Sequence, residues 1–314
     1  MANHLRKNKN LLVLAPTLNE LVSTYIHRLT TVNGFKDRQV MLHHIANRFG
    51  LPDNLGITPS VELIARLLNT TALDIILKHT ILPFTSILPG TVGTFDLRIT
   101  GEKLLLAASK HISKDLTYCK KCTDDEFDQI GWSSYKRHHQ LEHISYCHIH
   151  YGQPLLRNQP SSWDVWMPHL PANEKILYKI PVRSKMEIST QMKFHSYWSE
   201  LEQSTNFIDC DLMRLFLVST ARNQGFQTTP DDQGNHVFSD HILDIYGTGL
   251  FEEVYPARFK KTRGLLFDPV DGYLIYGYRS AAKITMILPI MMGLFESAET
   301  LIEEFSSFKY KLST

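Results

Sequence analysis

Two short pairs of cysteine and histidine constrain the fold of this chain more than any other feature of its sequence. Cys119 and Cys122 form a C-x-x-C pair, and after 24 intervening residues Cys147 and His150 form a C-x-x-H pair. Zinc prefers four tetrahedral thiolate and imidazole ligands, and each two-residue gap lets one turn hold two of them around the ion. The spacing therefore predicts one structural Zn²⁺ site, closed by four protein ligands, that stabilises the fold and takes no part in catalysis.

Alternatives to this zinc interpretation involve redox chemistry or other histidines. A C-x-x-C pair can be redox-active, but a thioredoxin-like motif occurs beside a βαβ pattern, which this region lacks. His148 lies between the second pair's members and could replace His150 as the fourth ligand, although the C-x-x-H register favours His150. His138, His139 and His143 could bind a second metal, but no cysteine pair accompanies them, so a packed helix or an interaction surface is the favoured interpretation.

Composition narrows the class of protein without identifying its function. The 314 residues include 33 Lys and Arg against 32 Asp and Glu, and the net charge of +1 excludes a protein held to nucleic acid by charge alone. Four cysteines are too few for the disulfide framework of a small secreted protein. The longest uncharged apolar stretch, residues 284–295, contains Pro289 and falls short of a membrane span. We expect a cytoplasmic protein with no membrane contact and no small-molecule substrate.

Helical signals dominate the sequence on both sides of the zinc pairs. Thr17 to Glu20 has the form of a capping box that opens a helix, and Asp37 is placed to cap the next one. Apolar residues then recur at helical spacing along much of the chain. We predict a mainly α-helical protein with three parts: a helical N-terminal domain over 1–112, a zinc-binding segment over 113–160 and a helical C-terminal domain over 161–314.

Within the N-terminal part, residues 61–80 have the pattern of a helix-turn-helix. Ala65, Asn69 and Ile75 fall at its small, turn and buried positions, and Thr71 to Asp74 resembles a capping box ahead of the second helix. Two packed helices without a role in DNA binding are the alternative. The second helix has few cations, so we expect the helix-turn-helix shape more firmly than direct reading of DNA.

The segment that contains the zinc pairs resembles the TniQ/TnsD family. That family's pattern runs C-P-x-C, then W-R-x-x-H-Q-L, then C-P-x-H-x-x-x-L. This chain has Y-C-K-K-C from Tyr118, Y-K-R-H-H-Q-L from Tyr135 and C-H-I-H-Y-G-Q-P-L from Cys147. The family's prolines are replaced by Lys120 and His148 and its tryptophan by Tyr135, while all four ligand positions are kept.

The resemblance extends upstream of the zinc pairs and covers roughly residues 14–156. Asn19 to Arg28 resembles the opening helix of the family, and His79 to Phe84 resembles the H-T-x-L-P element of its TnsD branch. The resemblance implies a non-catalytic adaptor that selects the target of a bacterial cut-and-paste transposon. Such adaptors recruit a AAA+ ATPase regulator, TnsC, which in turn engages the transposase.

The two branches of the family choose their targets differently. One branch binds attachment-site DNA, and the other is held, often as a homodimer, on a CRISPR Cascade effector whose guide RNA selects the target. The short chain favours the CRISPR branch, whereas the element His79 to Phe84 favours the attachment-site branch. A zinc-stabilised, sequence-specific DNA-binding regulator is the alternative function.

Enzyme motifs are absent from the sequence. The chain has no Gly-Lys dipeptide and therefore no P-loop, and it lacks G-x-S-x-G and H-E-x-x-H. Two basic clusters are instead candidate contacts to nucleic acid or to a partner, with a solvated charged turn as the alternative. The candidates are Lys120, Lys121, Lys136 and Arg137 near the zinc pairs, and Arg258, Lys260, Lys261 and Arg263 in the C-terminal part.

Overall fold

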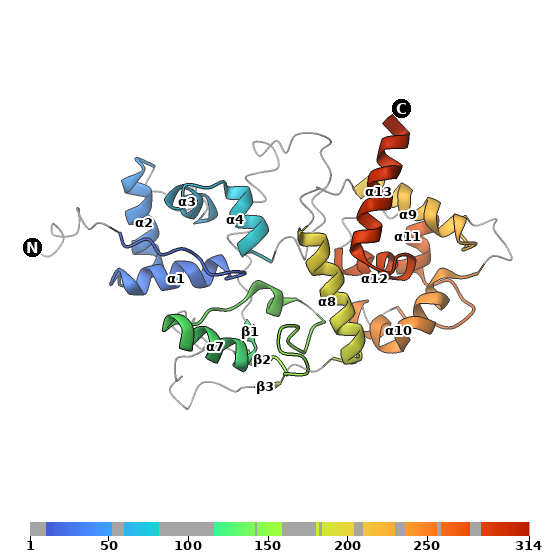
Figure 1. Ribbon diagram of the computed structural model, residues 1–314, viewed down its shortest axis with the longest axis horizontal. Coiled ribbons are helices and arrows are strands. Elements are labelled where there is room, and N and C mark those ends of the chain that lie inside the picture. Colours follow the sequence, from blue (N-terminus) through green and yellow to red (C-terminus); the bar gives the residue numbers. More distant parts are fainter. Residues whose placement is uncertain are drawn as a thin grey trace, which may run out of the picture. The chain divides into compact units, whose positions relative to one another are not determined.

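The computed structural model is mainly helical, as the sequence predicts (Figure 1). It describes residues 11–51, 60–81, 116–141, 143–158, 180–181, 184–203, 210–229, 236–255, 259–276 and 284–313. Contacts divide the described chain into two compact units. The first contains α1 to α4, β1, α7, η1 and β2, and the second contains residues 143–155 and the helices from α8 onward. Both predicted domain boundaries, near residues 112 and 160, lie outside the described residues and stay predictions.

Four short helices begin the first unit and enclose its core. They are α1 (Val22–Val32), α2 (Arg38–Arg48), α3 (Ser60–Leu67) and α4 (Ala72–His79). Their buried faces supply a continuous apolar cluster that includes Tyr25, Met41 and Ile64. Asp37 caps α2 as predicted, because its Oδ1 accepts a hydrogen bond from Val40 N at 2.9 Å.

The predicted pair of helices at residues 61–80 is confirmed as α3 and α4. Ala65 and Ile75 are buried, and Asn69 has a φ of 53° in the tight turn between the helices. Thr71 forms the predicted capping box: its hydroxyl accepts from Asp74 N at 3.0 Å, and the Asp74 carboxylate accepts from Thr71 N. These local interactions set the start of α4.

The first helix begins later than its capping-box pattern predicts. Glu20 Oε2 does accept a hydrogen bond from Thr17 N at 2.8 Å, but Asn19 has a left-handed φ of 58° and α1 starts only at Val22. Leu18, expected on the buried face of the helix, is 84% exposed. The backbone ahead of α1 pairs instead with a distant segment: Leu21 N donates to the Tyr135 carbonyl at 3.0 Å, and Arg137 N donates to the Asn19 carbonyl at 2.8 Å.

A small sheet and one helix complete the first unit. Strand β1 (Leu116–Tyr118) pairs antiparallel with β2 (Leu156–Asn158), with Thr117 opposite Arg157, and β3 (Ile180–Pro181) follows β2 in the sheet order. Helix α7 (Lys120–Ile130) begins directly after β1, and a 3₁₀ turn, η1 (Arg137–Gln140), follows it. Tyr118 and Tyr135 pack edge to face at 6.1 Å in a second apolar cluster.

The second unit is built around the apolar helix α12 (Ile284–Leu294), which packs against α8, α9, α10 and α13. Its other elements are α8 (Ile188–Gln203), α9 (Cys210–Asn223), α10 (Phe238–Val254), the π-helical turn η2 (Asp268–Gly272), α11 (Tyr273–Ile275) and α13 (Ala298–Ser313). Gly247, with φ 71° and ψ 177°, kinks α10. Helix α12 is thus a buried core helix, and none of the helices in the described ranges is long and apolar enough to span a membrane.

Candidate metal centre

The first ligand pair lies at the start of a helix. Cys119 is the N-cap residue of α7 and is fully buried, and Cys122 follows in the first turn. The Thr123 hydroxyl and the Thr123 amide each donate to the Cys119 carbonyl at 3.0 Å, which fixes the backbone of that turn. The positive end of the helix dipole favours thiolates at this position, and thiolates are the form that binds a metal.

The second ligand pair lies in a tight turn. Cys147 N donates to the Gln153 carbonyl at 2.9 Å, and Gln153 N donates to the His150 carbonyl at 2.9 Å. Gly152, with a φ of 80°, provides the left-handed residue that closes the turn. His150 N donates to Cys147 Sγ at 3.3 Å, and Cys147 Sγ lies 3.9 Å from His150 Nδ1. An amide hydrogen bond to the sulfur stabilises its thiolate form.

The potential ligand atoms of Cys119, Cys122, Cys147 and His150 all lie within 4.8 Å of one another. Tetrahedral ligands at about 2.0–2.3 Å from a zinc ion would lie roughly 3.5–3.8 Å apart, so a small contraction would bring these four atoms to bonding distance. Three thiols and one imidazole are a donor set that selects zinc over hard cations such as Mg²⁺ or Ca²⁺. The buried cluster can therefore bind a metal such as zinc.

Several histidines lie close to this cluster. His138 and His139 are buried in η1, with ring centroids 4.7 Å apart, and His139 Nε2 lies 4.0 Å from Cys122 Sγ. His138, His139 and His148 form a second group, in which one ring nitrogen from each histidine lies within 4.8 Å of the other two. The third histidine of the sequence prediction, His143, instead lies 3.8 Å from Glu253. Sequence spacing could not predict that His148 lies beside His138 and His139, because the fold of the chain brings these residues together.

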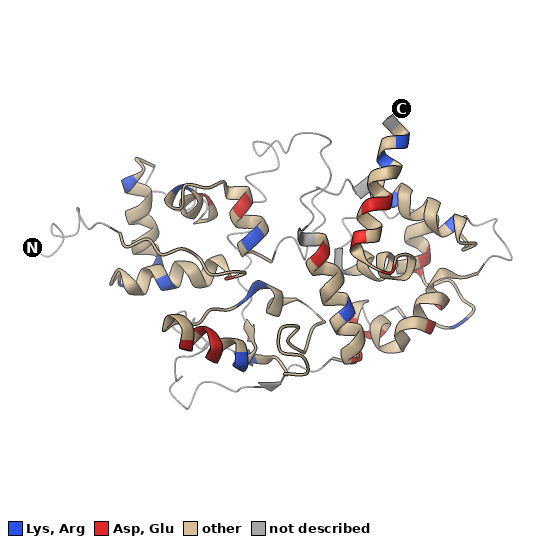
Figure 2. Ribbon diagram, in the orientation of Figure 1, with Lys and Arg blue, Asp and Glu red and all other residues tan. Residues whose placement is uncertain are grey.

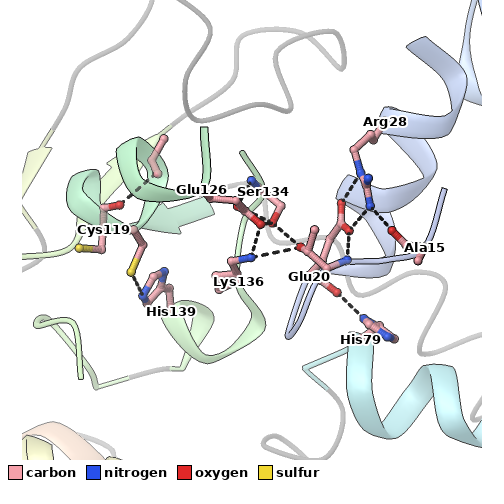
Figure 3. A network of polar contacts seen from close by, with 12 residues as sticks. Ala15, Glu20, Arg28, His79, Cys119, Glu126, Ser134, Lys136 and His139 are labelled. Carbon is pink, nitrogen blue, oxygen red and sulfur yellow. Dashed lines mark hydrogen bonds and ion pairs between the residues drawn. The ribbon is translucent and has the colours of Figure 1, made fainter. Parts of the chain in front are cut away.

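A buried polar network in the first unit links the first ligand pair's segment to the N-terminal helices (Figure 3). Lys136 Nζ donates to Glu126 Oε1 at 2.5 Å and to Thr17 Oγ1 at 3.1 Å. Burial raises the pKa of Glu20, while the Arg28 guanidinium beside it acts in the opposite direction. The Glu20 carbonyl also accepts a hydrogen bond from His79 Nδ1 at 2.9 Å, so that α4 joins the same network.

The basic residues near the metal ligands are divided between surface and interior. Lys120 and Lys121 are exposed. Lys120 Nζ lies 2.5 Å from Asp124 Oδ2, one turn further along α7. Figure 2 shows side chains of both charge signs on this helix. Lys136 is largely buried in the network above. Arg137 is buried and donates to the Leu77 carbonyl and to Asn19 Oδ1, and burial lowers its pKa to about 10.

The basic residues of the C-terminal part are also largely paired. Arg258 lies outside the described residues, and Lys260 is exposed. Lys261 Nζ lies 2.5 Å from Asp240 Oδ1 with its side chain only 2% exposed, and Arg263 forms an exposed ion pair with Asp244. Of the eight candidate contact residues, the described structure leaves Lys120, Lys121, Lys260 and Arg263 at the surface.

Comparison with known proteins supports the family suggested by the cysteine pattern. A search of curated proteins found no match to this chain. The TniQ family model matches residues 11–153, a range that contains α1 to α4 and all four potential metal ligands. Residues 11–153 therefore form a TniQ family domain.

Proposed function

We propose that this chain is a non-catalytic adaptor that links a transposition target to the AAA+ regulator TnsC and, through it, to the transposase. The observation that carries this proposal is the TniQ family domain over residues 11–153, with a buried Cys₃His group inside it. The domain supplies the link to target selection. We further propose that the chain contacts TnsC and either a CRISPR Cascade effector or attachment-site DNA. Contact with a second copy of the chain is also part of this proposal.

The donor set supports a structural rather than a catalytic metal. A catalytic zinc keeps one coordination position for water or substrate, whereas four protein ligands fill a tetrahedral ion. Cys119, Cys122, Cys147 and His150 would provide all four, and the bound ion would hold two chain segments that the sequence separates by 24 residues. The zinc would thus maintain the shape of the TniQ domain, and the chemistry of insertion would be left to the transposase.

The charges of the described residues favour targeting through protein partners over direct reading of DNA. Two of the proposed contacts form hydrogen bonds inside the first unit: Arg137 donates to Asn19, and Lys136 donates to Glu126. Helix α4, which would be the reading helix of a helix-turn-helix, carries Asp74 beside Lys78 at 3.6 Å. Phosphate contacts need an excess of available cations. The packed pair of α3 and α4, whose sequence has a helix-turn-helix pattern, is the feature that favours a zinc-stabilised DNA-binding regulator as the second candidate.

An insertion assay tests the adaptor function directly. A mini-transposon is supplied in a bacterial host together with the transposase and AAA+ regulator of the transposon that this proposal assigns to the chain. Insertion sites are sequenced with and without the chain. We expect targeted insertions only when the chain is present. Unchanged insertion sites and frequency in its absence would refute the adaptor function.

A gel-shift experiment with the purified chain separates the two candidates. An adaptor held on protein partners should bind random and genomic DNA weakly at about 150 mM salt, with a shallow salt dependence. Tight binding to one DNA sequence by the chain alone would favour the regulator, or the attachment-site branch of the family if targeted insertion also depends on the chain.

A further inference from the structure

Three histidines form a second group of potential metal ligands, separate from the four residues of the Cys₃His group. This histidine group consists of His138 and His139, which are buried in η1, and His148, which is partly exposed in the second ligand turn. One ring nitrogen from each lies within 4.8 Å of the other two. Imidazole nitrogens are good ligands for Zn²⁺, Ni²⁺ and Cu²⁺, so the group has the donor type and the spacing of a metal site.

The 3₁₀ turn that carries His138 and His139 is fixed by the side chain of Gln140. Gln140 Nε2 donates to the Thr117 carbonyl at 2.7 Å and to the Lys136 carbonyl at 2.9 Å, and Gln140 Oε1 accepts from Thr117 N at 2.9 Å. The Thr117 hydroxyl donates to the His139 carbonyl. These bonds tie η1 to strand β1, so the two histidines extend from a backbone that is already ordered before an ion binds.

The ring geometry of the histidine group suits a shared ion. The ring centroids of His138 and His139 lie 4.7 Å apart, with their planes at 82°. Two imidazoles on one tetrahedral zinc, each at about 2.0–2.1 Å, have centroids roughly 5 Å apart. His148 and His195 are instead stacked, with centroids 3.6 Å apart and planes at 11°. That separation is too short for two ligands of one ion, so His195 packs against the group without belonging to it.

The packing of His148 is supported by helix α8. His195 is buried in this helix, and Gln191 lies one turn before it. Gln191 Oε1 accepts from Ser145 N at 2.8 Å, and Gln191 Nε2 donates to the Met186 carbonyl at 2.7 Å. The segment that leads into the second ligand turn is therefore tied to the helix on which the His148 ring stacks. The partial exposure of His148 gives an ion a route into the group.

We propose that His138, His139 and His148 bind a second divalent transition-metal ion, such as Zn²⁺ or Ni²⁺, beside the ion of the Cys₃His group. Three imidazoles leave the fourth position of a tetrahedral ion to water. His139 Nε2 lies 4.0 Å from Cys122 Sγ, and a thiolate at Cys122 would favour a cation nearby (Figure 3). Without a thiolate ligand of its own, the second ion should be lost on dialysis while the Cys₃His group keeps its zinc. This inference does not depend on the adaptor function.

The test titrates Co²⁺ into the full chain after the chain has been loaded with one equivalent of Zn²⁺ and dialysed. Isothermal titration calorimetry measures uptake, and absorption spectra report the ligands. We expect the wild type to bind about one further Co²⁺ per chain, with the weak d–d bands of nitrogen and oxygen ligands and no thiolate charge-transfer band. Loss of an outer-shell partner alone typically costs about 10–100-fold in affinity, so H138Q/H148Q should bind Co²⁺ at least about a hundredfold more weakly.

Two further variants control for folding and for unspecific binding. H148Q alters only the partly exposed member of the group and should bind Co²⁺ at least about tenfold more weakly. H43Q/H44Q removes another pair of adjacent histidines, in α2, and should bind Co²⁺ as the wild type does. Circular dichroism and thermal unfolding establish that each variant is folded, and H148Q decides the outcome if H138Q/H148Q is not.

Three results would overturn the inference. The first is a wild type that takes up no further ion, or whose added Co²⁺ shows a thiolate charge-transfer band. The second is a folded H138Q/H148Q or H148Q protein that binds Co²⁺ as tightly as the wild type. The third is a folded variant that no longer retains its one equivalent of Zn²⁺, because these histidines would then serve the Cys₃His group instead of a second ion.

Discussion

Glu20 and Arg28 form a buried, two-point ion pair that ties the entry of α1 to its middle. Arg28 Nη2 lies 2.6 Å from Glu20 Oε2, Arg28 Nε lies 3.1 Å from Glu20 Oε1, and both residues are buried. Because the pKa of Glu20 remains raised despite Arg28, ionisation of this carboxyl becomes costly to the fold as pH rises through its folded-state pKa. A buried ion pair of this kind adds little net stability, because the desolvation of both charges offsets their mutual attraction.

Removing one partner of this pair should nevertheless destabilise the fold. In E20Q the Arg28 guanidinium stays buried without its carboxylate, which typically costs about 3–5 kcal/mol in the free energy of unfolding, measured by urea denaturation. The matched control is E62Q, which breaks the exposed Glu62–Arg66 pair of α3 and should cost less than about 0.5 kcal/mol. The double variant E20Q/R28M should recover part of the loss. Equal effects of E20Q and E62Q would contradict the role assigned to the buried pair.

Metal removal should destabilise the TniQ domain. Binding to the folded state contributes directly to folding free energy, and a loss of even about 3 kcal/mol would lower Tm by roughly 6–12 °C for a domain of about 150–250 residues. The wild type should contain about one zinc per chain by elemental analysis, and C147S should contain less. A chelator should lower the Tm of the wild type much more than that of C147S. Metal-free protein with unchanged thermal stability would exclude a structural zinc.

Sequence spacing anticipated each cysteine or cysteine–histidine pair of the potential metal site, and the paired helices, because these depend on residues close together in the chain. A C-x-x-C turn and a Thr71–Asp74 capping box are local structures, so their patterns can be recognised without knowledge of the fold. The roles of Lys136 and Arg137 could not be recognised in this way. Their partners Thr17 and Asn19 lie more than 100 residues away, and basic residues in a polar segment are usually exposed. For the same reason the pattern at Thr17 to Glu20 placed the start of α1 too early.

Arg137 should behave as a structural residue rather than as a DNA contact. R137A leaves the Leu77 carbonyl and the Asn19 side chain without their donor, a loss that typically costs about 1–3 kcal/mol or more in the free energy of unfolding. The control K121A removes an exposed cation of α7 and should change stability by no more than about 0.5 kcal/mol. A folded R137A protein of unchanged stability but lower DNA affinity would reverse this assignment.

The capping box of α4 should make stability depend on acid pH. Hydrogen bonds from Thr71, followed by one from Thr70, hold the pKa of Asp74 below its ordinary value near 3.8. A carboxyl with a lowered folded-state pKa contributes stability that is present above its unfolded value and is lost as pH falls through the folded one. At pH 7, T71A should therefore lose about 1 kcal/mol in the free energy of unfolding. The stability difference between the wild type and D74N should shrink below about pH 4, and a difference independent of pH would contradict this.

Two glycines of the second unit should respond differently to alanine, because they are constrained by different physical causes. A Cβ on Gly249 of α10 would lie 2.3 Å from the Lys185 carbonyl oxygen, which is backbone and cannot rotate away. A Cβ on Gly264 would meet nothing within 4 Å, but its φ of 79° is unfavourable for alanine. We expect G264A to cost about 1–2 kcal/mol in the free energy of unfolding and G249A to cost more, because α10 must separate from residues 184–186. Thermal and urea unfolding of both variants would measure this, and a G249A protein as stable as the wild type would show that the close contact between α10 and Lys185 is not present in solution.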